Sequence, residues 1–185
     1  MSASALALGI VLFVPLGMAA AYSRIGPALV GLVGAARVVP SLAVLFLLLP
    51  IMGTGFFPAL VALTLLSAPP IVINTDAGLR GVDPAVLESG SGLGMSPWQQ
   101  FARVRFPLAL PLVVAGIRTS AVEVVASATL AAFIGAGGLG SFILAGLTLL
   151  DFKLLLVGAL PVTILALAVE LALSQLEKMV APPGQ

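Results

Sequence analysis

The chain has 185 residues, of which 61% are hydrophobic and only 8% are charged. Soluble domains carry about 25% charged residues, so this composition excludes a soluble globule and indicates an integral membrane protein. A net charge of +1 argues against nucleic acid as a partner. The absence of cysteine excludes disulfides, thiolate metal sites and cysteine nucleophiles, and histidine is absent as well. We expect no metal site and assign no catalytic residue.

Five apolar stretches are long enough to cross a membrane, which takes roughly 20 helical residues. They run continuously instead of alternating, which favours helices over a β-barrel. The first lacks a basic start, so we expect it to remain as an anchor and not to be cleaved. The second contains Arg37 and Pro40, so its apolar core is expected to begin near Val38. The fold class is thus an all-α membrane protein, a single domain over residues 1–185, with spans at residues 3–22, 28–52, 56–73, 108–133 and 154–173.

Lysine and arginine positions predict the orientation. With the N-terminus outside, five basic residues fall on the inner side and only Lys153 on the outer side, as the positive-inside rule requires. The C-terminus would then be cytoplasmic. The inner residues are Arg24, Arg80, Arg103, Arg105 and Lys178.

The third and fourth stretches are separated by a polar segment, residues 74–107, with six of the fifteen charged residues. It predicts two short helices. Asp83 before Pro84 is an N-cap followed by proline at the first helical position, and Ser96 with Gln99 forms a capping box. Trp98 lies on one face of the second helix with the residues three and four positions later. This cytoplasmic loop is therefore predicted to be a docking element.

Three glycines, at positions 90, 92 and 94, are expected to end the first helix and to let another surface approach closely. Pro107 is expected to stop the second helix before the fourth span.

Two alternative roles remain for the polar segment 74–107. Its helices could lie in the lipid headgroup region, or form a DNA-binding helix-turn-helix, for which two arginines give little phosphate neutralisation.

The segment resembles the cytoplasmic signature of permease subunits in ATP-binding-cassette importers. That signature is Glu-Ala-Ala, three residues, Gly, nine residues, Ile, one residue, Leu-Pro, and the chain keeps its spacing. The resemblance covers residues 25–176 and, within the family, is to the glycine betaine, carnitine and choline branch. Ser89 and Gly90 replace two alanines, and Ile73 and Asp76 are further departures. The matching residues are Glu88-Ser89-Gly90, Gly94, Val104 and Phe106-Pro107, with Pro40-Ser41-Leu42-Ala43, Gly78-Leu79-Arg80-Gly81-Val82-Asp83-Pro84, Leu108-Ala109-Leu110-Pro111, Ala115-Gly116-Ile117-Arg118-Thr119 and the run 128–140.

The resemblance implies a type I importer permease with the MetI-like fold, in a bacterial or archaeal plasma membrane. It implies two permease subunits, identical or paralogous, a cytoplasmic ATPase that uses ATP and Mg, and a separate extracytoplasmic solute-binding protein. This chain is expected to bind no cofactor, since it has no Gly-x-x-x-x-Gly-Lys-Ser/Thr loop. The residues expected to couple to the ATPase are Asp83, Glu88, Gly90, Gly94, Trp98, Phe101, Phe106 and Pro107.

Polar residues within the spans are candidates for the translocation pathway, because a central charge in lipid costs about 2.5–3.5 kcal/mol on insertion scales. Arg118 and Glu123 point about 140° apart on a helix, so each needs its own partner or water. A carboxylate could meet a quaternary ammonium group, and a structural ion pair to another helix is the alternative. Arg37 and Glu170 lie closer to the predicted span ends and are expected to be snorkelling or interface charges. Weaker candidates, which could equally hydrogen-bond within the bundle, are Asn74, Ser127 and Thr129.

A glycine-rich run at residues 135–140 satisfies the dinucleotide pattern G-x-G-x-x-G. It follows a membrane helix instead of a strand, and no acidic residue lies about 20 positions further on, so we discard nucleotide binding. The segment from 135 to 152 could be re-entrant. Its glycines are expected to serve either a gate or a tight turn near the outer face, and they are Gly135, Gly137, Gly138 and Gly140.

The sequence thus predicts the permease subunit of an ATP-driven osmoprotectant importer, itself not an enzyme, in contact with membrane lipid. The rivals are a secondary transporter, whose halves usually show repeats absent here, a membrane scaffold without transport activity, and a permease for a different small solute. The cytoplasmic signature argues against the first two.

Overall fold

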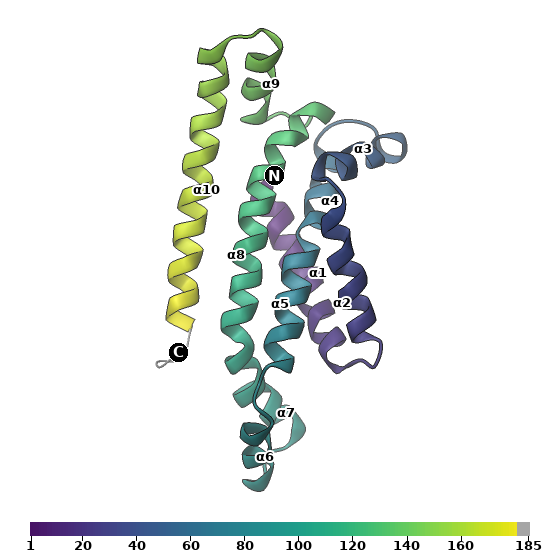
Figure 1. Ribbon diagram of the computed structural model, residues 1–185, viewed down its shortest axis with the longest axis vertical. Helices are drawn as coiled ribbons and strands as arrows, with labels where there is room; N and C mark the ends of the chain where they lie inside the picture. The colour runs from purple at the N-terminus through teal and green to yellow at the C-terminus, as the bar shows by residue number, and fades with distance from the viewer. Residues whose placement is uncertain (181–185) are drawn as a thin grey trace.

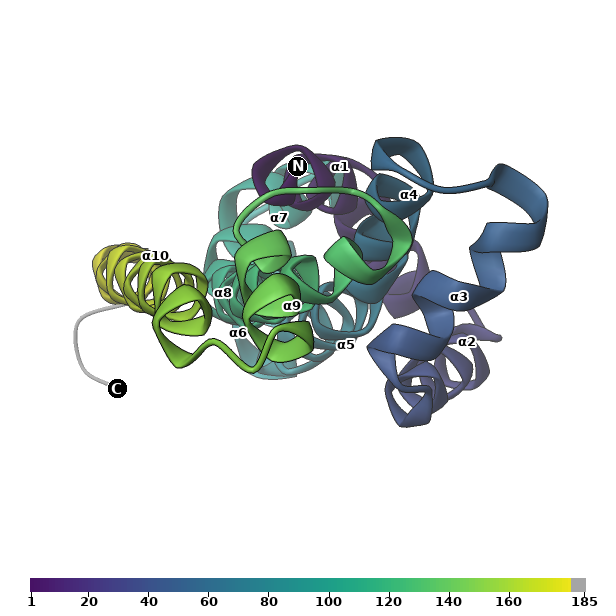
Figure 2. The same cartoon turned by 90° about the horizontal axis from the view of Figure 1, so that it is seen from above.

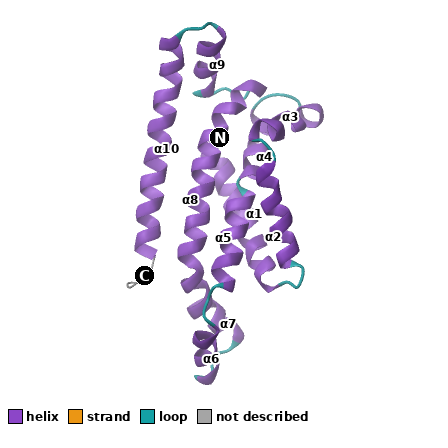
Figure 3. Cartoon of the chain, in the orientation of Figure 1, coloured by secondary structure: helices purple, strands orange, loops and turns teal. Residues whose placement is uncertain are grey.

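The computed structural model describes residues 1–180, and the secondary structure within them is entirely helical (Figure 3). Helix α1 (Ser2–Tyr22) has 21 residues, a length of about 31 Å at 1.5 Å per residue. Four helical segments within residues 1–180 have the length and hydropathy of a membrane span, and a bent helix pair makes a fifth. The prediction of an all-helical membrane protein with about five spans is confirmed.

The chain runs up and down between two ends of an elongated bundle (Figure 1). Helix α1 descends toward the end that carries the short helices α6 and α7, α2 returns beside it, and α3 lies at the far end. The chain then descends through α4 and α5, ascends through α8, turns at α9 and descends again through α10. The bounds are α2 (Gly26–Ala35), α3 (Ser41–Met52), α4 (Phe56–Leu66), α5 (Ala68–Arg80), α6 (Pro84–Gly92), α7 (Pro97–Gln100), α8 (Phe106–Leu130), α9 (Gly140–Thr148) and α10 (Phe152–Val180).

The second predicted span is not one straight helix. Helix α2 continues through a 3₁₀ turn, η1 (Ala36–Val38), and the chain then bends by 96° into α3. Pro40 explains the break, because its ring disfavours helical geometry at the preceding residue, and Val39 is extended at φ −74°, ψ 121°. Arg37 therefore lies at the bend between two half-helices.

The third span is longer than predicted and absorbs the start of the polar segment. Helices α4 and α5 form a continuous stretch of 25 residues that ends at Arg80 and not near Ile73. Asn74 and Asp76 are therefore helical residues of α5, and the connection between spans starts only at Gly81. Hydropathy placed the boundary too early because α5 is amphipathic and its polar residues are partly covered by neighbouring helices.

Pro107 does not stop the second short helix, so that prediction is wrong. Helix α7 passes through a π turn, η2 (Phe101–Arg105), directly into α8, and residues 97–134 form one continuous helical segment. The wider turn is closed by Phe106 N–H donating to the Phe101 carbonyl. It ends just before Pro107, which lacks an N–H, so the proline is accommodated without a break in direction.

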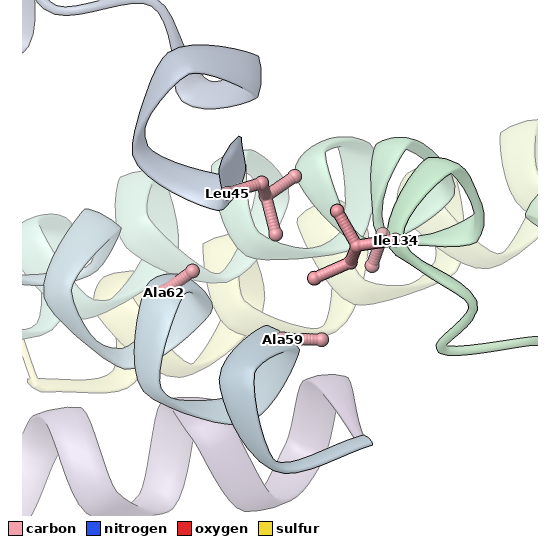
Figure 4. Packing of buried hydrophobic residues seen from close by; sticks show 5 residues of the cluster. Leu45, Ala59, Ala62 and Ile134 are labelled. Atoms are coloured by element: carbon pink, nitrogen blue, oxygen red, sulfur yellow. The ribbon is translucent and has the colours of Figure 1, made fainter. Parts of the chain in front are cut away.

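The interior of the bundle is formed by α1, α5 and α8, which approach closely at glycines. A Cβ atom at Gly17 would lie 2.7 Å from the Cβ of Thr75, and one at Gly116 would lie 2.7 Å from the Pro70 carbonyl oxygen. Small residues of this kind let helix backbones approach each other in lipid, where dispersion contacts drive association. At the far end, a smaller cluster joins α3 and α4 to the 3₁₀ turn η3 (Ala131–Ile134); it contains Leu45, Ala59, Ala62, Ala131 and Ile134 (Figure 4).

The remaining helices are peripheral. Seen from above, α10 lies at one edge of the molecule and α2 with α3 at the other, while α5 and α8 lie between them (Figure 2). In their most apolar windows, 61% of the residues of α4–α5 are buried, against 6% for α10. Much of the peripheral surface is therefore available to lipid or to other subunits.

Candidate functional site

Helix α6 begins and ends with the predicted caps. The Asp83 carboxylate accepts a hydrogen bond from the Ala85 N–H at 2.8 Å. At the other end, the Met95 N–H donates to the Gly90 carbonyl at 3.1 Å, and the Gly94 N–H donates to the Ser91 carbonyl at 2.9 Å. These two bonds form a Schellman motif, which needs a left-handed residue, and Gly94 supplies it at φ +76°. Gly94 is thus required by the turn itself.

Helix α7 carries the predicted capping box. The Ser96 N–H donates to Gln99 Oε1 at 2.9 Å, and the Gln99 N–H donates to Ser96 Oγ at 3.3 Å. Gln100, which the sequence analysis missed, ties the two short helices together: its Nε2 donates to the Leu87 carbonyl and to Ser91 Oγ. No local sequence signal distinguishes this glutamine from an ordinary exposed one.

The α6–α7 pair projects beyond the bundle (Figure 1), and large apolar side chains are exposed on it. Trp98 is 72% exposed and Leu93 is 80% exposed. The Trp98 ring stacks on Phe101 with centroids 5.6 Å apart, and Phe101 in turn contacts Phe106 at 5.8 Å. Glu88 is exposed and takes part in none of the ion pairs of residues 1–180. A tryptophan exposed on a rigid helix is the type of residue that anchors protein interfaces.

Arg105 of η2 joins the base of this pair to the bundle, and Arg80 joins α5 to α1 beside it. Arg105 Nε donates to the Leu79 carbonyl at 2.9 Å, and its guanidinium lies 4.8 Å from the centroid of the Tyr22 ring. Arg80 binds Asp76 at 2.9 Å and donates to the Ala20 carbonyl at 2.7 Å. Both arginines therefore satisfy carbonyls near the ends of α1 and α5. Through Arg105, the π turn that follows α7 contacts both of these interior helices.

Arg118 forms ion pairs across the α8–α10 contact. Its Nε lies 2.8 Å from Glu170 Oε1, and its Nη1 lies 2.7 Å from Glu177 Oε2. Glu170 is therefore paired with Arg118, a contact that the sequence analysis did not predict. The sequence did contain a signal, because Glu170 and Glu177 are seven residues apart and so lie on one helix face. Within residues 1–180, these contacts correspond to the structural ion pair that the sequence left open for Arg118.

Glu123 faces a different environment. It lines a cavity of about 700 Å³ between α1, α2, α3, α5 and α8, together with Arg37, Ser41, Ser127 and mainly apolar side chains. Arg37 is close enough to interact electrostatically with Glu123, although neither takes part in the ion pairs of the described chain. Arg118 is thus paired to α10 and Glu123 lines this cavity, but both also line a second cavity with Glu170, so the opposed directions predicted for them are only partly realised.

The weaker pathway candidates also fall into two groups, those that bond within the bundle and one that lines the Glu123 cavity. Asn74 donates to the Pro70 carbonyl of its own helix at 2.8 Å and packs against Gly116, so it serves helix packing. Thr129 donates to the Ala126 carbonyl at 2.7 Å. Ser127 is buried and lines the Glu123 cavity. Of these three, only Ser127 is brought together with a charged candidate.

The glycine-rich segment forms a tight turn into α9. Gly135, Gly137 and Gly138 all have positive φ, between +73° and +82°, where other residues are strained. A Cβ atom at Gly140 would collide with the Thr129 carbonyl. The segment is also anchored, since the Gly55 N–H donates to the Ile134 carbonyl at 2.8 Å. This geometry gives the turn a structural explanation, and a gating role stays a prediction.

Comparisons with known proteins match this arrangement. Residues 13–182 match the family described as binding-protein-dependent transport system inner membrane component. The chain is 45% identical over 181 residues to the glycine betaine/carnitine/choline transport system permease protein OpuCB of Bacillus subtilis (strain 168), covering 97% of this chain and 83% of the relative. It is 48% identical over 182 residues to the carnitine transport permease protein OpuCB of Listeria monocytogenes, covering 98% and 84%.

A further relative is the choline transport system permease protein OpuBB of Bacillus subtilis (strain 168), 44% identical over 97% of this chain and 83% of the relative. Among solved structures, the chain resembles a chain of the MetNI methionine ABC transporter in an inward-facing conformation, with a TM-score of 0.81. That match covers 98% of this chain and 92% of the other at 21% identity, so it bears on the fold alone. The chain is a multi-pass inner membrane protein, and the ATPase is a separate subunit in its family. It belongs to the family of binding-protein-dependent transport system inner membrane components.

Proposed function

We propose that this chain is the permease subunit of an ATP-driven importer of quaternary ammonium osmoprotectants. The observation that carries the proposal is the α6–α7 pair, which projects from the bundle with Trp98 exposed and is held at its base by Arg105. A secondary transporter or a scaffold needs no such element, whereas a permease driven by a separate motor needs a surface on which that motor acts.

The solute class is proposed from the relatives. The three permeases compared above are named for glycine betaine, carnitine and choline, and they are 44–48% identical to this chain over nearly all of it. All three solutes carry a quaternary ammonium group. The proposed complex contains two permease subunits, an ATPase on the cytoplasmic side of α6–α7, and an external binding protein.

The orientation belongs to the same proposal. Arg24, Arg80 and Lys178 lie at the α6–α7 end of the bundle, as do the two arginines of η2, whereas Lys153 follows the turn at the opposite end. The positive-inside rule then places α6 and α7 in the cytoplasm and the start of α1 outside.

The test is uptake by proteoliposomes containing the permease with its ATPase and binding protein. Glycine betaine should accumulate only with ATP on the ATPase side and with binding protein on the other. Methionine provides the contrasting solute, because the structural neighbour is a methionine transporter. Purified permease alone should show little affinity by calorimetry, since the external protein captures the solute. Micromolar binding by the permease alone, or uptake without ATP, would favour a secondary transporter and refute the proposal.

A further inference from the structure

The cavity that contains Glu123 combines two charges of opposite sign with apolar walls. Glu123 projects from α8, and Arg37 lies at the bend between α2 and α3. Phe13 and Leu16 of α1 and Val44 of α3 are among the apolar side chains that line the space between them. With a volume of about 700 Å³, the cavity has room for a small solute and its water.

The two charges have no structural partner of the kind that Arg118 has. The ion pairs of residues 1–180 join Arg80 with Asp76, and Arg118 with the two glutamates of α10. Glu123 and Arg37 are outside these pairs, and Arg37 interacts electrostatically with Glu123. A charge in a membrane span is expensive and normally faces a partner or water, so two such groups on one cavity mark a functional site.

The chemistry of the pair fits a zwitterion. A carboxylate attracts a quaternary ammonium group electrostatically, although that group has no N–H to donate, and apolar walls suit its methyl groups. A guanidinium presents two parallel N–H donors that match a carboxylate. A small solute with a cationic head and a carboxylate would satisfy both charges at once.

We propose that the cavity between the α2–α3 bend and α8 is a solute subsite within a single permease chain, in which Glu123 holds the quaternary ammonium head and Arg37 holds the carboxylate of a zwitterionic osmolyte. This inference rests on the proposed function, and it adds a division of labour between the two charges. Glu123 contacts every quaternary ammonium solute. Arg37 contacts only solutes with a carboxylate, such as glycine betaine and carnitine, and not choline.

The test compares three solutes in proteoliposomes of the complete importer. Glu123→Gln should lower the initial uptake of all three by about tenfold or more, as expected for loss of a contact to a charged group. Arg37→Gln should lower uptake of glycine betaine and carnitine by a similar factor and change choline uptake less than about twofold. Arg37→Lys should restore part of the loss. Arg24→Gln, an exposed arginine at the α1–α2 connection, is the matched control and should transport like wild type.

A second measurement uses no comparison between solutes. The chain contains no cysteine, so Ser127→Cys places a single thiol on the cavity wall. Glycine betaine supplied during turnover should protect this thiol from alkylation, and the protection should disappear when Glu123→Gln is added.

Several outcomes would overturn the inference while leaving the proposed function intact. These are equal slowing of all three solutes by Arg37→Gln, failure of glycine betaine to protect the thiol in a transporting complex, and loss of permease assembly in Glu123→Gln, which would mark Glu123 as a partner for the second subunit. If the wild-type complex transports none of the three solutes, the proposed function fails and the subsite fails with it.

Discussion

The interior helices and the peripheral elements of this chain are held together in different ways. Helices α1, α5 and α8 fit by shape, with glycines such as Gly17 and Gly116 allowing close approach of their backbones. Helix α10 also contacts its neighbours at glycines, where Gly146 meets Leu155 and Gly158 meets Ile143, but its link to α8 includes the ion pairs of Arg118. The α6–α7 pair is secured by caps and by Gln100, and Arg105 of η2 binds a carbonyl of α5 at its base.

This difference indicates which parts of the chain serve folding and which remain available for function. The interior helices have little exposed surface, whereas the peripheral helices keep large exposed apolar areas after folding. Lipid can cover such areas on α10 and on α2, which lie along the apolar part of the bundle. The α6–α7 pair extends beyond that part, so the exposed Trp98 there requires a protein partner or a membrane surface.

The largest effect is expected from enlarging an interior glycine. In Gly116→Val, the new side chain would meet the Pro70 carbonyl oxygen and the Asn74 side chain, which would lie 2.7 and 2.8 Å from the added Cβ. One of these neighbours is backbone and cannot rotate away, so α5 and α8 must separate, at about 1–3 kcal/mol for overpacking. The midpoint of thermal unfolding in mild detergent should fall sharply.

Gly31→Val is the matched control, because Gly31 is also a helical glycine but has no atom within 4 Å of an added Cβ. Its unfolding midpoint should stay close to that of wild type. Equal losses in the two variants would show that helix propensity, and not close approach in the interior, determines the sensitivity.

A smaller and more selective effect is expected at Trp98. Trp98→Ala should weaken ATPase docking by about 2 kcal/mol if this exposed ring is an interface anchor, which corresponds to roughly a 30-fold change in Kd. Stability of the membrane domain should hardly change, because the ring is 72% exposed in the isolated chain. Binding of the purified ATPase to permease in nanodiscs measures the effect, and unchanged binding would instead favour an interfacial role for these helices.

The same docking measurement distinguishes two roles of the glycines that follow α6. Gly94→Leu should block docking, but its φ of +76° means that the substitution also strains the turn. Gly92→Leu adds the same bulk at a position without positive φ and with open space around it. Gly94→Asn keeps a residue that tolerates the left-handed region. Loss with both leucines and retention with asparagine would indicate steric exclusion of the ATPase; loss only with Gly94→Leu would indicate the turn.

Removing the ionic link of α10 should have a more modest effect. Arg118→Gln leaves Glu170 and Glu177 facing each other without their cation, so the unfolding midpoint should fall further than in Glu170→Gln or Glu177→Gln. All three side chains are about one-third exposed, which limits the loss. The double variant Arg118→Gln/Glu170→Gln should be more stable than the sum of its single losses predicts. Simple additivity would mean that the pair is not coupled and that glycine contacts alone hold α10.

The sequence predicted the elements whose signals are local. The Asp83 cap and the Ser96–Gln99 capping box follow from residues within a few positions of one another, whereas of the three glycines expected to end the first helix only Gly94 lies beyond its last residue. Hydropathy likewise located the spans, because a lipid-facing helix must be apolar along its length. The family resemblance was carried by the same short segments.

Features that depend on distant residues were not predictable in this way. The pairing of Arg118 with Glu170 joins residues 52 positions apart, and the approach of Arg37 to Glu123 depends on the bend at Pro40. Hydropathy also ended the third span too early, since it registers polar residues and not whether neighbouring helices cover them. Gln100 was missed because its two acceptors lie on another helix.

The smallest effect on stability is expected from substituting two exposed positions for thiol labelling. The labelling shows which end of the bundle faces the cytoplasm. Since the chain has no cysteine, Leu93→Cys and Thr148→Cys each provide a single thiol at one end of the bundle, and neither side chain contributes to the interior, so the stability of the membrane domain should hardly change. Leu93, which is 80% exposed, is preferable to Gln100, whose side chain joins α6 to α7. An impermeant thiol reagent should label Leu93→Cys only from the cytoplasmic side and Thr148→Cys only from outside or not at all. Labelling of Leu93→Cys from outside would reverse the positive-inside assignment and leave the exposed Trp98 on the side where no ATPase is present.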